Sequence, residues 1–193
     1  MAGRPKIFDE QIALEKAANL FWKKGFEATS MDDLLPAMGV QKGSFYHSFG
    51  SKKELYVRAI DWHENNGFEA FRKMVKNQKQ PIELIKSIFL SLADCAPEDH
   101  RKGCFLGNTI AELSNIDENL VENAAKHLKT LENIFYEQIK ASQKSGELKT
   151  KIEPELLALY LLNLWNGINI TRRVYPSKKG LKSLIEFQLQ ILE

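Results

Sequence analysis

Cysteine is scarce in this chain of 193 residues, since Cys95 and Cys104 are the only two. Two cysteines are too few for a disulfide framework, which fits a reducing compartment. Long apolar runs are also missing, because no stretch of 18 or more apolar residues occurs and residues 1–6 lead into a charged amphipathic segment. We therefore expect a cytoplasmic protein with no membrane partner.

Catalytic and metal-binding motifs are absent as well. The sequence has no G-x-S-x-G, Walker or dinucleotide-binding motif, and no paired-carboxylate site is recognisable. Cys95, His100, Cys104 and His127 raise the question of a metal site, but their spacing matches no four-ligand pattern. We therefore expect no enzyme activity, no metal and no cofactor.

Charge of one sign is in excess only at the N-terminal end. Residues 1–58 hold nine Lys or Arg and seven Asp or Glu, whereas the remaining residues hold eighteen of each. A reader of nucleic acid needs only a local basic face, so this distribution permits DNA binding. The excess is too small to identify a DNA-binding protein by itself.

Helical periodicity dominates what is present. Apolar residues recur with a period near 3.6, and no sustained period-two alternation occurs, which predicts an all-α fold. Glycines at 25 and 39, prolines at 81, 97 and 176, and capping boxes at 30–33 and 51–54 suggest the helix ends. The predicted helices cover residues 9–24, 31–38, 42–47, 51–77, 81–96, 103–113, 118–145, 154–175 and 178–192, with a loop at 96–99.

Residues 31–47 have the pattern of a helix-turn-helix DNA reader: a short helix, a turn containing Gly39, and a second short helix of small and polar residues. The second helix must fit a major groove about 12 Å wide. Gly43 and Ser44 permit close approach, while Lys42, Tyr46 and His47 reach phosphates or base edges. Phe45 and Phe49 are expected to face the core.

The next helix offers a positive N-terminal end to a phosphate, at Ser51, Lys52 and Lys53. An ordinary three-helix core without a DNA role is the alternative interpretation of this whole region. In that case His47 is only a polar residue that faces solvent.

From Gly25 to Leu55 the sequence resembles the TetR-type repressors. Glycines, caps, turn and the aromatic pair Phe45 and Tyr46 fall in the family's order. The resemblance is specific over residues 8–60 and architectural beyond them. It implies a homodimer with one DNA-binding head per subunit, dimerised through the last two helices and released from an inverted-repeat DNA operator when a small-molecule effector binds.

The resemblance divides the chain into a helix-turn-helix domain at residues 1–50 and an effector-binding and dimerisation domain at residues 51–193. Arg4 and Lys6 look like the basic arm that relatives place in a minor groove, although a disordered chain end has the same composition. The residues expected to contact DNA are Arg4, Lys6, Thr29, Ser30, Gln41, Lys42, Gly43, Ser44, Tyr46, His47 and Lys52.

A second resemblance lies in the stretch from Gly103 to Leu113, which is similar to the glycine-cysteine helix of a TetR subgroup that includes electrophile and redox sensors. A helix beginning near Gly103, with Arg101 and Lys102 beside it, would stabilise the Cys104 thiolate. Cys104 is then the residue through which an electrophile or oxidant releases DNA. An inert, buried cysteine is the alternative.

Aromatic and amide side chains of the second domain either line an effector pocket or form the core. Asn166 is a further amide that needs a partner on an apolar helix. The pocket is expected to include Trp62, Phe68, Phe71, Phe89, Cys104, Phe105, Asn108, Phe135, Trp165 and Asn169. The dimer interface is expected to include Leu156, Leu159, Tyr160, Asn163, Leu181, Leu184, Ile185, Gln188 and Leu192.

Two other function classes remain possible from the sequence. An enzyme would turn over a substrate and ignore operator-like DNA, but the required catalytic groups are not recognisable. A helical interaction module would have lost DNA binding, which the presence of Lys42, Tyr46 and His47 argues against.

Overall fold

The fold of the chain was analysed in a computed structural model, which describes residues 8–76, 78, 80–175 and 177–193. Helices account for most of these residues, and no strand occurs among them. The all-α prediction is therefore confirmed. Within the described ranges no helix has both the length and the apolar character needed to cross a membrane.

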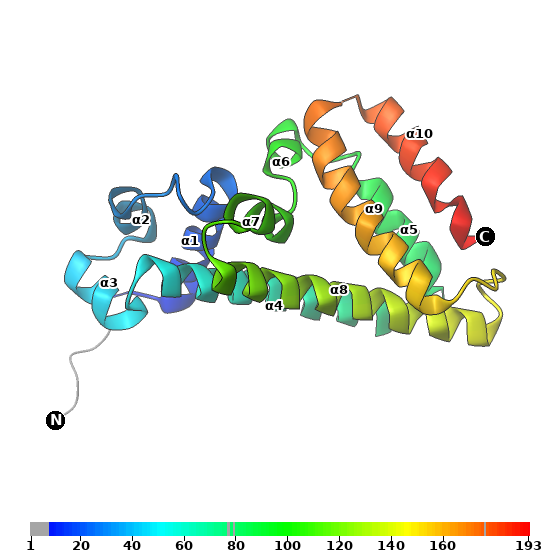
Figure 1. The fold of residues 1–193 in the computed structure, drawn as a ribbon, viewed down its shortest axis with the longest axis horizontal. Coiled ribbons are helices and arrows are strands. Elements are labelled where there is room, and N and C mark those ends of the chain that lie inside the picture. The colour runs from blue at the N-terminus through cyan, green and yellow to red at the C-terminus, as the bar shows by residue number, and fades with distance from the viewer. Residues whose placement is uncertain (1–7, 77, 79, 176) are drawn as a thin grey trace. The chain divides into compact units, whose positions relative to one another are not determined.

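The elements follow the predicted order closely. The helices are α1 (Glu10–Lys24), α2 (Met31–Met38), α3 (Lys42–Phe49), α4 (Lys52–Lys76), α5 (Pro81–Ser91), α6 (Pro97–Lys102), α7 (Phe105–Leu113), α8 (Glu118–Ser145), α9 (Pro154–Val174) and α10 (Lys178–Leu189), followed by a 3₁₀ turn at Gln190–Leu192 (Figure 1). The ends of α2 and α8 are as predicted. Gly39 ends α2 with φ 69° and ψ 34°, a left-handed conformation that glycine adopts at little cost.

Helix α6 is a correction, because its first residues were expected to form a loop. Ala96 is extended, with φ −63° and ψ 151°, as the residue before a proline must be. Pro97 then takes the first helical position, where its missing N–H is not needed. Helix α5 also ends at Ser91, earlier than predicted, and turns follow it.

The chain divides into two compact units. The first unit comprises Met1–Gly67 and Asn108–Ala124, and the second comprises Phe68–Gly107 and Ala125–Glu193. This grouping differs from the predicted boundary at residue 50, since most of α4 and most of α7 belong with α1–α3. Helices α4, α7 and α8 each contribute residues to both units.

The first unit is a small helical domain built around aromatic and aliphatic side chains. Tyr56 contacts the rings of Phe21 and Phe26, with centroids 4.7 Å and 4.8 Å away. Its hydroxyl hydrogen bonds to Thr109 of α7 at 2.7 Å, and burial raises the pKa of Tyr56. Fully buried members of this core include Phe21, Leu34, Phe45, Leu55, Ile60, Leu113 and Leu120.

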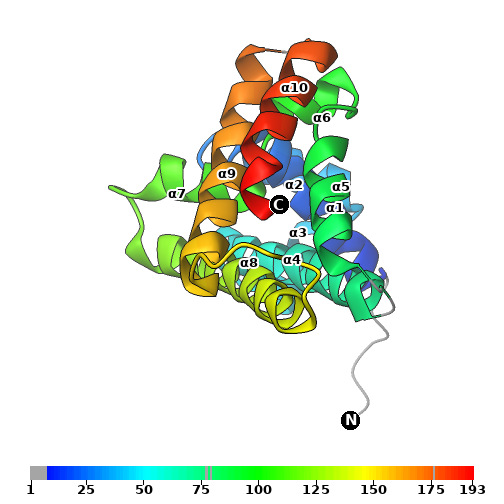
Figure 2. The same ribbon diagram turned by 90° about the vertical axis from the view of Figure 1, so that its right-hand side faces the viewer.

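The second unit is a helical bundle in which α5, α9 and α10 lie side by side (Figure 2). Its core contains Phe71, Phe89 and Phe135, with ring centroids of Phe89 and Phe135 5.9 Å apart. Helix α10 contributes Leu181, Ile185 and Leu189 to the same core. The interior of this unit therefore includes several residues that the sequence assigned to a pocket or to an interface.

Candidate DNA-binding face and sensing region

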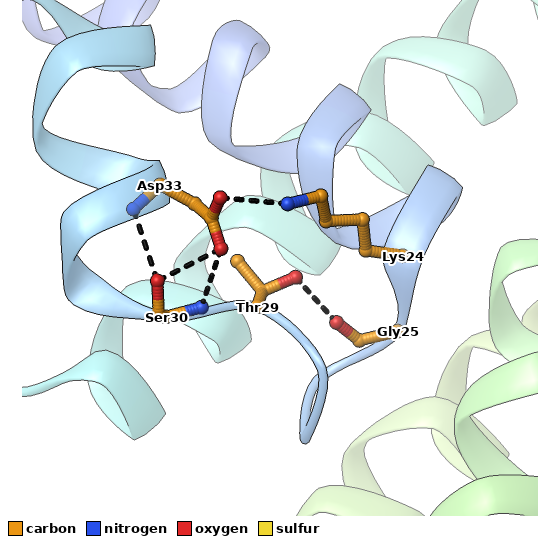
Figure 3. Close-up of polar contacts among 5 residues, drawn as sticks. All are labelled: Lys24, Gly25, Thr29, Ser30 and Asp33. Atoms are coloured by element: carbon orange, nitrogen blue, oxygen red, sulfur yellow. Dashed lines mark hydrogen bonds and ion pairs between the residues drawn. The ribbon is translucent and has the colours of Figure 1, made fainter.

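The N-terminus of α2 is held by a capping box (Figure 3). Ser30 Oγ accepts a hydrogen bond from the Asp33 N–H at 3.1 Å, and Asp33 Oδ2 accepts from the Ser30 N–H at 3.0 Å. The Lys24 side chain, 2.7 Å from Asp33 Oδ1, and the Ser30 contacts hold the pKa of Asp33 well below its usual range. These contacts fix the first helix of the pair against α1.

Helix α3 presents two different faces. Phe45 and Phe49 are buried, with ring centroids 5.7 Å apart, as expected for residues that orient the helix. Lys42, Tyr46 and His47 are exposed. A side chain placed on Gly43 would meet nothing within 4 Å, so the surface beside these three residues is open to a close-fitting partner. Gln41 is also exposed, and Ser44 is half-buried.

Arg58 of α4 holds the C-terminal end of α3 in place, a role that the sequence did not suggest. Its Nη1 donates to the Ser48 carbonyl at 2.7 Å, and its Nη2 pairs with Glu10 of α1. The guanidinium also lies over the Phe49 ring, 4.9 Å from the centroid. The orientation of α3 therefore depends on contacts from both α1 and α4.

Thr29 is a correction to the set of DNA-contacting residues. Its side chain is fully buried, and its hydroxyl donates to the Gly25 carbonyl at 2.6 Å, so no atom of the side chain faces a partner (Figure 3). The hydroxyl of Ser30 is exposed but is already used in the capping box. Arg4 and Lys6 lie outside the described residues.

The start of α4 has a capping box of its own, as predicted, between Ser51 and Glu54. The Ser51 N–H donates to Glu54 Oε2 at 2.8 Å, and the Glu54 N–H donates to Ser51 Oγ at 3.1 Å. Lys53 pairs with Asp117 at 2.7 Å, whereas Lys52 places its Nζ 4.4 Å from the Phe26 ring centroid. Among the described residues no carboxylate pairs with Lys52, which keeps this lysine suited to a phosphate.

Glu112 of α7 binds the loop between α1 and α2, a contact that sequence reasoning missed. Its two carboxylate oxygens accept hydrogen bonds from the Phe26 N–H at 3.1 Å and the Glu27 N–H at 2.8 Å. Together with the contact between Thr109 and Tyr56, this carboxylate fixes α7 to the helix-turn-helix. The sequence offered one signal, the spacing of the two residues. Glu112 follows Thr109 by three positions, which puts both side chains on the same face of the helix.

In the second unit, the segment from Gly103 to Gly107 runs along α9. Arg172 donates to the Gly103 carbonyl at 3.1 Å, and Arg173 donates to the Lys102 carbonyl at 2.7 Å. Cys104 is half-buried directly before α7, and its Sγ accepts a hydrogen bond from the Gly107 N–H at 3.4 Å. The thiol therefore lies at a helix N-terminus, as predicted, but the expected neighbour Lys102 pairs with Asp99 at 2.8 Å instead.

The residues predicted to line a pocket are divided between the two units. Phe68, Phe71, Phe89, Phe105 and Phe135 are buried, and all except Phe105 belong to the core cluster of the second unit. Trp165 packs partly buried against that cluster, and Asn169 is buried on α9. Trp62 and Asn108 belong to the first unit.

The predicted interface residues separate into two groups. Leu181, Ile185 and Leu192 are a correction, because they are buried in the core of the second unit itself, in α10 and the 3₁₀ turn after it. Leu156, Leu159 and Leu184 are 60%, 52% and 39% exposed, which is unusual for leucine. Asn163 is exposed, while Tyr160 and Gln188 are half-buried and joined by a 2.9 Å hydrogen bond from the tyrosine hydroxyl. Other large apolar side chains exposed on α9 and α10 are Ile170, Val174 and Phe187.

No group of three or more His, Cys, Asp or Glu arranged for a metal ion occurs in the described part of the chain. The chemistry available at the DNA-binding face is hydrogen bonding and charge: a lysine, a tyrosine hydroxyl and an imidazole on one exposed helix surface. Such a surface suits DNA contact through phosphates and base edges.

Comparison with known proteins places these features in a family. Residues 13–59 match the model of the bacterial regulatory proteins of the tetR family, and residues 81–187 match that of the tetracyclin repressor-like C-terminal domain. The HTH-type transcriptional repressor ComR of Escherichia coli is 28% identical over 98% of this chain and 91% of its own length. YezE of Bacillus subtilis, an uncharacterised HTH-type regulator, is 26% identical over 99% and 100%.

Solved structures share the fold. Reduced NemR of E. coli superposes with a TM-score of 0.85 at 21% identity, covering 96% of this chain and 98% of NemR. A cysteine mutant of the regulator CifR, bound to a 26-base-pair operator, superposes with a TM-score of 0.83 at 21% identity, covering 99% of this chain and 100% of CifR.

Proposed function

The chain belongs to the TetR family of DNA-binding transcriptional repressors, and from this premise we propose which residues contact its operator and how it is released. The observation that carries the proposal is the exposed face of α3. Lys42, Tyr46 and His47 project from a helix whose opposite face is locked into the core by Phe45 and Phe49. In this proposal α3 enters the major groove, and Lys52 binds an adjacent phosphate. The proposal also has the protein act in the cytoplasm, which is consistent with a DNA-binding regulator.

The proposed active form is a homodimer, which is typical of the family. The exposed leucines Leu156, Leu159 and Leu184 support an interface formed by α9 and α10, because isolated chains rarely expose so many large apolar groups on neighbouring helices. Two reading heads would require an inverted-repeat operator with half-site centres about 34–36 Å apart or a multiple of that distance.

Sedimentation of Leu159→Glu against wild type tests the interface, with a monomer expected from the variant and a dimer from wild type. A monomeric wild type at micromolar concentration would contradict it.

Release is proposed to start at Cys104 or at a small-molecule site beside it, and to pass along α7. The helix begins at Phe105, directly after Cys104, and carries Thr109 and Glu112, which hold the helix-turn-helix. A shift of its start would therefore disturb the loop at Phe26. A tenfold loss of operator affinity requires only about 1.4 kcal/mol of differential stabilisation between the DNA-competent and the DNA-incompetent state.

The cysteine mutations named for CifR and the reduced form named for NemR support attention to thiols in this chain. N-ethylmaleimide is a suitable probe, since the Cys104 thiolate adds through its sulfur to the carbon–carbon double bond, which then takes up a proton. Wild type is expected to lose operator affinity on modification, while Cys104→Ser keeps it. Equal release of both, or full affinity of wild type after confirmed modification at Cys104, would leave a non-covalent effector as the remaining mechanism.

The direct test of DNA reading is selection of binding sites from a random pool of double-stranded DNA. Wild type is expected to enrich an inverted repeat, and the Lys42→Ala, Tyr46→Ala double variant is expected to enrich none while keeping its helical content. Lys144→Ala, an exposed change in the second unit, serves as the matched control. Identical enrichment by wild type and the double variant would exclude the exposed face of α3 as the reader.

A further inference from the structure

Four buried polar atoms lie where α6 and the start of α7 pack on α9, and none of them has a hydrogen-bond partner among the described residues. They are His100 Nδ1, Asn166 Oδ1, Asn169 Oδ1 and Arg172 Nε. Two further such atoms occur elsewhere, in Asn123 and Gln188. Buried polar groups are normally paired, so their concentration in one region requires an explanation.

Arg172 is the central group of this region. Its side chain is only 4% exposed, and no carboxylate in the described part of the chain lies at ion-pair distance from it. Its neighbours are the Gly103 carbonyl at 3.1 Å and the Cys95 sulfur at 3.6 Å. Asp99 feels its charge, but Asp99 is paired with Lys102 at 2.8 Å. Burial lowers the pKa of Arg172, and a guanidinium nevertheless stays protonated in proteins. A buried cation without an anion is unfavourable.

The neighbouring asparagines show which other hydrogen-bonding groups a partner of this region would have to offer. Asn169 donates its Nδ2 to the Trp165 carbonyl at 2.8 Å, which fixes the orientation of the amide and leaves Oδ1 as the unpaired acceptor. Asn166, Asn169 and Arg172 follow one another at intervals of three residues along α9, so they share a face of the helix. The region therefore offers a positive donor at one end and hydrogen-bond acceptors along its length.

Gly107 leaves room for one further carbon atom beside α9. A Cβ atom on this glycine would lie 3.6 Å from Asn166 Oδ1 and 3.6 Å from the Cys104 Cβ, which are ordinary contact distances. An added carbon is therefore accommodated without displacing its neighbours. The glycine leaves this room directly beside the unpaired Asn166 oxygen and the Cys104 side chain.

We propose that this region is a binding site for a small carboxylate, whose anionic group pairs with Arg172 and whose hydroxyl or amino hydrogens bond the Asn166 and Asn169 oxygens. Carboxylate and guanidinium form short, charge-assisted hydrogen bonds, and Nε–H is one of the donors used in two-point pairing. The proposal deepens the proposed function, because it names the chemical class of the effector. Binding can be measured on the protein without DNA, so its failure is distinguishable from failure of operator binding.

Thermal unfolding of the full chain under reducing conditions tests the site. Sodium acetate and sodium lactate are compared with acetamide and sodium chloride at equal ionic strength. Both carboxylates are expected to raise Tm saturably, lactate at lower concentration because its hydroxyl can donate to an asparagine oxygen. Acetamide and chloride are expected to have no saturable effect. Equal stabilisation by chloride, or no stabilisation by either carboxylate, would overturn the proposal.

Substitutions then locate the binding. Arg172→Gln is expected to weaken carboxylate binding at least about tenfold, while Arg173→Gln, the same change at the neighbouring exposed residue, keeps it. If Arg172→Gln fails to fold, carboxylate binding is measured with Arg172→Lys and Gly107→Ala instead, and weaker binding than in wild type is expected. The first keeps the charge without the Nε donor, and the second fills the space while favouring helix. Wild-type binding by both would make the proposal wrong, even if operator selection succeeds.

Discussion

The DNA-binding unit and the sensing unit use their polar side chains in opposite ways. Around the helix-turn-helix, Asp33, Glu54 and Glu112 each bind backbone N–H groups, and Lys24 and Lys53 are paired with carboxylates. On α9 of the sensing unit, by contrast, Asn169 and Arg172 are buried with unpaired atoms. The comparison indicates that the polar groups that hold the helix-turn-helix are paired without a ligand, whereas Asn169 Oδ1 and Arg172 Nε are not.

The largest effect should come from the inner side of α3. Phe45→Ala removes a fully buried ring from the first unit and should reduce the free energy of unfolding by about 3–5 kcal/mol. Tyr46→Ala, one residue away but 49% exposed, should cost less than about 1 kcal/mol and abolish operator binding. Chemical denaturation and operator titration of both variants measure the contrast. Similar losses of stability in the two variants would contradict the assignment of the two faces.

Glu112 comes next, because it fixes α7 to the reader. Glu112→Ala leaves two backbone N–H groups without their acceptor and should destabilise the first unit by about 1–3 kcal/mol, with weaker operator binding. Glu122→Ala, an exposed change in the same unit, should stay within about 0.5 kcal/mol of wild type. If the two variants behave alike in denaturation and operator titration, the link between α7 and the reader has no energetic role.

The cap of α2 should matter somewhat less. Ser30→Ala removes the side-chain acceptor for the Asp33 N–H, and loss of such a cap costs about 0.5–2 kcal/mol. The cost should appear as a lower Tm in thermal unfolding. A Tm equal to that of wild type would show that water replaces the serine hydroxyl without loss.

The pH dependence of the same cap has a definite sign. The folded-state pKa of Asp33 is lowered from 3.8, chiefly by Lys24, so its stabilising effect is present above that value and is lost as the pH falls further. The difference in stability between wild type and Asp33→Asn should therefore shrink in acid. A difference that grows on acidification, measured by denaturation at several pH values, would oppose this assignment.

Lys52 should give the smallest effect on folding, because it contacts Phe26 at the surface rather than filling the core. Lys52→Ala should leave Tm nearly unchanged and reduce the slope of log affinity against log salt concentration by about 1. Lys144→Ala should leave the slope as it is. An unaltered slope in Lys52→Ala would remove this residue from the phosphate contacts.

Local chemistry explains how far the sequence could predict these features. The capping boxes at Ser30 and Ser51 and the glycine at position 39 act over a few residues, so they predicted α2, α3 and the start of α4. The buried face of α3 was predicted from its two phenylalanines, Phe45 and Phe49. The start of α6 at Pro97 was missed because a proline after an extended residue fits both a loop and a first helical turn.

Long-range contacts account for the rest. Arg58 and Glu112 reach partners 48 and 85 residues away in the sequence, for which periodicity gives no signal. Burial of Leu181 and Ile185 depends on which face of α10 packs on α5, and an apolar stripe does not distinguish a core from an interface. Thr29 was assigned to DNA from its place in a motif, whereas its hydroxyl serves the backbone.

Operator affinity of ligand-free protein tests the central comparison most directly. The chain is unfolded, dialysed under reducing conditions to remove small molecules and refolded, and its affinity for a selected operator is then measured without additions. The account predicts specific, tight binding by this protein, since the polar groups that hold the helix-turn-helix are paired without a ligand. Specific binding that appears only after a small molecule is added would contradict it.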